Sequence, residues 1–124
     1  MNNAKVKTYL KSASEALTKC EIADSSNSII STYQSNISAF ESAIANGSFK
    51  AAVAFFSDDA DGSKVKRSQL ISAMYYIVKQ ESLDAKEICK KIFELSPAEQ
   101  NALRRDFINA AAALKRTMML FDLK

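Results

Sequence analysis

The sequence almost lacks the two residue types that most often mark turns. Two glycines and one proline are present in 124 residues, where average usage would supply roughly a dozen or more. A β-sandwich or barrel needs turn residues about every 8–12 positions, and this chain cannot supply them. The sequence therefore predicts an all-α fold, and the chain length indicates a single domain covering residues 1–124.

Apolar residues recur at helical spacing in six segments separated by polar breaks, which predicts a compact bundle of about six helices. The expected helices cover about residues 5–23, a segment ending at Asn46, and residues 48–56, 64–80, 82–95 and 96–121. Gly47 is expected to end the second helix in a left-handed conformation. Ser82 is the expected cap of the fifth helix. A capping box at Ser96 and Glu99, with Pro97 at the first helical position, is the strongest helix-start signal.

The composition excludes several kinds of chemistry. Histidine is absent, so no histidine base, nucleophile partner or metal ligand is available. Cys20 and Cys89 form no CxxC motif and are interpreted as small buried hydrophobes without a disulfide. We therefore expect no catalytic residues, no metal, no cofactor and no small-molecule substrate, and the chain is not expected to be an enzyme.

The segment Asp58-Asp59-Ala60-Asp61-Gly62 offers the one alternative to this expectation. Three carboxylates could hold a divalent cation and support a metal-dependent hydrolase. However, the segment lacks the following glutamate and the ligand spacing of an EF-hand loop. The pattern favours a solvated loop that caps the next helix.

The start of the sequence is not expected to be a signal peptide. The residues after Met1 are polar, with no apolar run of a signal peptide behind them. No stretch approaches the ~18 apolar residues of a membrane span. We expect a cytoplasmic protein with no membrane partner.

Charge is segregated along the chain. Residues 1–20 carry a balance of +3, residues 21–62 a balance of −5, and residues 63–124 a balance of +5. Two basic segments around an acidic middle fit a protein with one face for phosphates and another for neighbouring proteins.

Nine basic residues of the second half are the candidate contacts to a nucleic-acid backbone. Lys64, Lys66 and Arg67 are expected in the first turn of a helix, where the helix dipole disfavours cations by ~0.3–1 kcal/mol each but favours bound phosphate. The alternative is that the upstream aspartates neutralise this cluster. The remaining six form three pairs: Lys90 with Lys91, Arg104 with Lys115, and Arg105 with Arg116.

The last two pairs share a spacing of eleven residues, or about three helical turns. Arg105 and Arg116 are expected in a solvent-facing row, with Arg104 and Lys115 along the edge of the apolar stripe. Such rows can contact a sugar-phosphate backbone without reading sequence, and the alternative is a solvated face with no ligand. No set of base-reading aromatic residues is expected beside them. Tyr76 is expected to pack under a neighbouring helix, and the alternatives are stacking on a base or burial in a subunit contact.

Four short stretches resemble a known family. They are Tyr33-Gln34-Ser35, then Ile44-Ala45-Asn46-Gly47-Ser48-Phe49, then Ala52-Val53-Ala54-Phe55, with Ala112-Ala113-Leu114-Lys115-Arg116 near the end. In the small-subunit family of type III-B CRISPR effector complexes (the Cmr small subunit), a tyrosine-bearing helix ends in an Asn-Gly turn. A short helix that finishes in an Ala-Phe pair follows. The sequence is similar to that family in length, helix order and break positions.

The resemblance implies a non-catalytic helical subunit in antiviral defence. Copies would stack head to tail along paired guide RNA and target RNA, beside the larger subunits. The alternative is a small helical adaptor or regulator that binds only protein, through Tyr75, Tyr76, Met118 and Met119. The two hypotheses differ in salt dependence, because only phosphate binding weakens steeply as salt rises.

Overall fold

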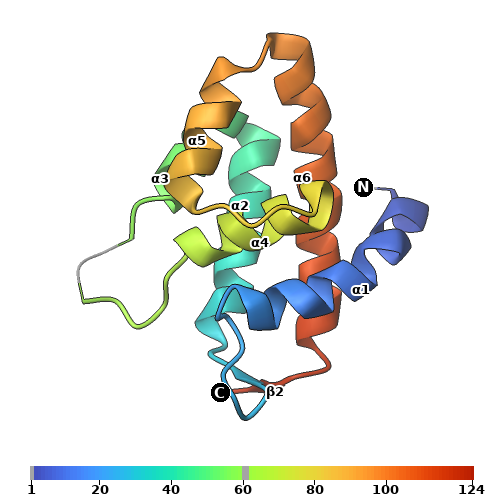
Figure 1. Cartoon of the computed structure of the whole chain (residues 1–124), viewed down its shortest axis with the longest axis vertical. Helices are drawn as coiled ribbons and strands as arrows, with labels where there is room; N and C mark the ends of the chain where they lie inside the picture. The colour runs from blue at the N-terminus through green and yellow to red at the C-terminus, as the bar shows by residue number, and fades with distance from the viewer. Residues whose placement is uncertain (1, 60–61) are drawn as a thin grey trace.

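The computed structural model describes residues 2–59 and 62–124, and most of them lie in helices (Figure 1). The helices are α1 (Asn3–Lys19), α2 (Thr32–Asn46), α3 (Phe49–Phe56), α4 (Ser68–Lys79), α5 (Ala85–Glu94) and α6 (Pro97–Met118). The expectation of an all-α fold with six helices is therefore confirmed for the described residues.

The longest helix, α6, organises the core. It packs against α1, α2, α3 and α4, and α1 and α4 cross it in Figure 1. The small side chains of residues 110–113 are all buried, which lets neighbouring helices approach its backbone closely. Phe107 of α6 joins an aromatic cluster, with ring centroids 5.3 Å from Phe49 and 6.4 Å from Phe40. The apolar stripe of the last predicted helix therefore faces the core.

A minor sheet was missed by the sequence analysis. Strands β1 (Ser28–Ile29) and β2 (Asp122–Leu123) pair in parallel, with Ile29 opposite Leu123. The N–H of Lys124 donates to the carbonyl of Ile29, and the N–H of Ser31 donates to the carbonyl of Lys124, both at 2.9 Å. The expected helix to residue 121 was wrong by three residues, because the chain leaves α6 after Met118 to make these bonds.

The helix ends confirm one predicted cap and correct two others. Ser96 and Glu99 form the capping box, and the hydrogen bonds from Ser96 lower the pKa of the Glu99 carboxyl. Asp84, rather than Ser82, caps α5 through a 2.9 Å bond to the N–H of Glu87. Gly47 is extended, at φ −148°, rather than left-handed. Chain reversal after α2 therefore needs no positive φ, and Ser48 caps α3 at the next residue.

Helix α4 begins at Ser68, which is later than expected. The Asp59 carboxylate accepts hydrogen bonds from the N–H of Ser68 at 3.0 Å and from its hydroxyl. The prediction that the aspartate loop caps the next helix is confirmed for Asp59, whereas Asp61 lies outside the described residues. Asp58 is exposed. The described part of this segment therefore forms a capping loop, as its sequence pattern favours, and not a cluster of carboxylates.

Candidate nucleic-acid interface

Arg105 and Arg116 form what we call the outer row of α6. Both side chains are exposed, and they flank the point where the start of α1 meets α6. Arg116 Nη2 donates to Asn3 Oδ1 at 3.3 Å, while the Asn2 N–H donates to Asn109 Oδ1 at 2.9 Å. Among the described residues, the only side-chain partner of either arginine is the neutral amide of Asn3. Both guanidinium charges therefore remain available to an anion.

Arg104 and Lys115 form the inner row, and both contact α2. Arg104 Nε donates to the carbonyl of Ile44 at 3.2 Å, near the C-terminal end of α2. Lys115 Nζ lies 2.9 Å from Glu41 Oε1 in an ion pair. A carbonyl at a helix C-terminus has no partner within the helix and attracts cations. The inner row therefore fastens α6 to α2 and has little charge left for a ligand.

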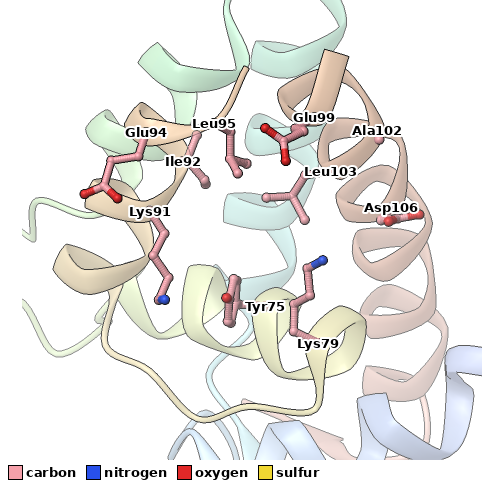
Figure 2. Close-up of a pocket in the computed structure, with 10 residues that line it drawn as sticks. All are labelled: Tyr75, Lys79, Lys91, Ile92, Glu94, Leu95, Glu99, Ala102, Leu103 and Asp106. Atoms are coloured by element: carbon pink, nitrogen blue, oxygen red, sulfur yellow. The ribbon is translucent and has the colours of Figure 1, made fainter. Parts of the chain in front are cut away.

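Lys90 and Lys91 are predicted as a pair, but they line two different concave sites. Lys90 lines a groove between α3 and α5. Lys91 lines a pocket between α4, α5 and α6, together with Tyr75 and Lys79 (Figure 2). Successive helix positions are rotated by about 100°, so adjacent residues on α5 serve different surfaces.

The pocket beside Lys91 has a volume of about 550 Å³ and mixed charge. Figure 2 shows Lys79 and Lys91 on either side of Tyr75. Glu94, Glu99 and Asp106 also line the pocket, and the Glu99 carboxylate is already engaged in the capping box. Cations and carboxylates in similar number give the pocket no clear preference for an anionic ligand.

Lys64 and Lys66 lie in the loop before α4, not in its first turn as the sequence analysis expected. The loop backbone is held in a non-helical path, because the Lys66 N–H donates to the Tyr33 hydroxyl at 3.2 Å. That hydroxyl in turn donates to Gln69 Oε1 at 2.9 Å, and burial raises the pKa of Tyr33. Both lysine side chains are exposed, so they remain candidates without the help of a helix dipole.

Arg67 is the N-cap residue of α4, and its side chain folds back onto the protein. The guanidinium carbon lies 4.2 Å from the ring centroid of Phe55 and 5.6 Å from that of Phe56. Nη2 donates to the carbonyl of Asp58 at 2.9 Å. Nε is buried and has no hydrogen-bond partner among the described residues. Arg67 therefore holds the loop against α3 and is a poor candidate for an external phosphate.

The groove between α3 and α5 holds residues that the sequence analysis did not select. Phe93 of α5 is 53 % exposed, and Lys50 Nζ of α3 lies 5.2 Å from its ring centroid. Lys86 lines the same groove as Lys90, one helical turn away. Phe93 is thus an exposed aromatic side chain beside cations, whereas the expected lack of a base-reading aromatic set stays a prediction. Phe93 lies off the apolar face formed by Ile88 and Ile92, and that position was a usable signal.

The residues proposed for a protein-only adaptor are mostly enclosed. Tyr75 and Met118 are buried. Tyr76 packs against α1, with its hydroxyl 3.1 Å from Glu15 Oε2 and Lys19 Nζ 5.6 Å from its ring centroid. The prediction that Tyr76 packs under a neighbouring helix is confirmed. Only Met119 of that set is exposed.

The described residues contain no site suited to a bound metal or an activated thiol. Within residues 2–59 and 62–124, no three Cys, Asp or Glu side chains gather as metal ligands would. Cys20 and Cys89 are free thiols and only partly buried, which corrects the expectation of full burial. Burial nonetheless raises the pKa of Cys20 to about 11. The Cys20 thiol therefore stays protonated at neutral pH and is a weak nucleophile or ligand.

Comparisons with protein-family models, curated proteins and solved structures give no match. None of the described helices combines the length and the apolar character that crossing a membrane requires.

Proposed function

We propose that the protein is a non-catalytic small subunit of a type III-B CRISPR (Cmr) effector complex. In this role it binds the backbone of guide RNA and target RNA during antiviral defence in the cytoplasm. One observation carries the proposal: six of the nine candidate cations are exposed and have no carboxylate at ion-pair distance among the described residues. They are Lys64, Lys66, Lys90, Lys91, Arg105 and Arg116.

Exposed cations without partners suit a polyanion for an energetic reason. Each cation that neutralises a phosphate releases condensed counterions, which favours binding without any base contact. An interface with protein would leave such charges to be desolvated without compensation unless the partner is acidic. The proposal therefore favours phosphate over a purely apolar contact surface.

Several residues that carry the family resemblance have structural roles in this chain. Asn46 and Gly47 form the turn between α2 and α3, and Ala52 lies on the buried face of α3. Tyr33 anchors the loop before α4 through its hydroxyl.

Contacts with other subunits, including neighbouring copies of the same chain, are also part of the proposal. Leu120, 84 % exposed, and Met119 lie together just beyond α6. Exposed apolar residues gathered in one place often mark protein contacts. We propose this end of the molecule as a subunit contact that adjoins Arg116, the last cation of the outer row.

The outer row gives the direct test of RNA binding. Arg105→Glu with Arg116→Glu should weaken binding by about tenfold or more and flatten the salt dependence by roughly one unit for each phosphate that is no longer bound. The effect should be the same for two unrelated RNA sequences. Lys7→Glu with Lys11→Glu is the matched control, because it changes the net charge equally on exposed positions of α1.

Filter binding at several salt concentrations measures both the affinity and the slope. Unchanged affinity and slope in the outer-row variant would favour the protein-only adaptor. An equal loss in the control would show an effect of net charge alone. Purification of the tagged chain from its own cells tests the complex: guide RNA and larger subunits should accompany it, and their absence contradicts the proposal.

A further inference from the structure

The groove between α3 and α5 combines an apolar floor with a basic rim. Its volume is about 690 Å³, within the roughly 300–1,000 Å³ of typical ligand sites. Ala54 of α3 and Phe93 of α5 are apolar lining residues, while Lys86 and Lys90 line it from one side of α5. Because its lining comes from two helices, the groove is part of the folded structure.

Phe93 is the unexpected residue in this groove. The packing of α5 uses other positions, namely Ala85, Ile88 and Ile92, which are buried. Phe93 leaves more than half of its surface in solvent, where an aromatic ring gains little from packing. An exposed aromatic side chain in a concave site is available to stack on a flat ligand.

The charges at the groove complement an anionic ligand. Lys86 and Lys90 are exposed and are one helical turn apart, while Lys50 reaches the ring of Phe93 from α3. Asp58 and Glu94 also line the groove, but no ion pair joins them to these lysines among the described residues. Lys86 and Lys90 balance the two carboxylates along the lining, and Lys50, beside the Phe93 ring, adds one further cation outside it.

We propose that the α3–α5 groove binds an unpaired segment of RNA, with one base stacked on Phe93 and the adjacent phosphates held by Lys86 and Lys90. Stacking on a protein ring requires an open base face, which a base inside a duplex does not offer. An amphipathic protein helix would instead need a row of apolar anchor sites at helical spacing. Among the described residues, Phe93 is the single large exposed apolar side chain that lines this groove, so such a row is not present. This inference rests on the proposed RNA-binding function and adds that the RNA segment in the groove is single-stranded.

The chain contains no tryptophan, so Phe93→Trp gives a single fluorescent reporter in the groove. A single-stranded oligouridine should quench this tryptophan, and a duplex of equal length should quench it much less. Phe55→Trp is the matched control, because Phe55 is 60 % exposed on α3 but does not line the groove. Position 55 should show little quenching.

Two further variants test the roles of the groove residues. Phe93→Ala should weaken single-strand binding by about tenfold, and Lys86→Ala with Lys90→Ala should raise the RNA concentration needed for half-maximal quenching severalfold. Circular dichroism checks that each variant retains its helices. An unchanged single-strand affinity in these folded variants would overturn the groove assignment.

Fluorescence anisotropy of labelled RNA separates the two proposals. RNA binding without quenching at position 93 overturns the groove proposal and leaves backbone binding intact. Equal quenching by duplex, or at position 55, also overturns it. No binding of any RNA overturns both proposals. If the emission of the Phe93→Trp variant instead changes with protein concentration alone, the groove is a contact between protein molecules.

Discussion

The two rows of α6 have the same spacing and opposite roles. Arg104 and Lys115 contact α2, through the carbonyl of Ile44 and the carboxylate of Glu41. Arg105 and Arg116 follow each of them by one residue and are exposed. A rotation of about 100° around the helix separates cations that stabilise the fold from cations available to a ligand.

The fold also separates two other adjacent pairs, and the first of them shows the same division. Lys66 is exposed, while Arg67 stacks on Phe55. Lys90 and Lys91 enter two different hollows. A count of basic residues along the sequence therefore overstates the charge offered to a partner, because part of it is used within the fold.

Charge reversal in each row should give the largest contrast. Arg104→Glu with Lys115→Glu removes a charged hydrogen bond and places a carboxylate beside Glu41, and should lower the free energy of unfolding by about 2–4 kcal/mol. The outer-row reversal, Arg105→Glu with Arg116→Glu, should change it by only about 0.5 kcal/mol or less. Urea denaturation of the two variants, which have equal net charge, measures the difference. Equal destabilisation would contradict the division into two rows.

The pair before α4 should show a smaller contrast of the same kind. Arg67→Ala removes the stacking on Phe55 and the hydrogen bond to Asp58, and should cost about 1–2 kcal/mol of stability. The loss of a buried, unpartnered Nε offsets part of the cost. Lys66→Ala should leave stability unchanged within about 0.5 kcal/mol and flatten the salt dependence of RNA binding. Thermal unfolding measures the stability of the two variants, and filter binding measures how they bind RNA. A stable Arg67→Ala variant with weakened RNA binding would reverse the assignment.

The smallest effect is expected from single truncations at positions 115 and 116. Lys115→Ala should cost about 0.2–1 kcal/mol, because its ion pair with Glu41 is partly exposed. Arg116→Ala should cost less. Added salt screens such a pair, so the difference between the two variants should shrink at high salt. A difference that persists in concentrated salt would indicate that the Lys115 stem, rather than its charge, supplies the stability.

Much of the fold could be predicted because its signals are local. Six apolar stripes at helical spacing and the Ser96–Glu99 capping box depend on residues within a few turns of one another. The late start of α4 depends partly on Tyr33, whose hydroxyl holds the loop before Ser68 through a contact distant in sequence. Such long-range hydrogen bonds leave no periodic pattern to detect.

The candidate site could be predicted only in part, for the same reason. The sequence identifies Arg105 and Arg116 as solvent-facing, because their place on the helical wheel excludes the core. It does not show that α2 ends beside Arg104, or that Phe55 lies under Arg67. The position of Phe93 off the apolar face of α5 was visible, but the lysine from α3 that accompanies it was not.

The parallel pairing of β1 and β2 has a consequence for the order of folding. The two strands are separated by most of the chain and contain only two residues each, so neither can form a stable pair alone. Closing so long a loop costs entropy, which the packing of α6 against α1 must offset first. The amide of Lys124, bonded to Ile29, should therefore gain protection from hydrogen exchange among the last in refolding, after the helices have assembled.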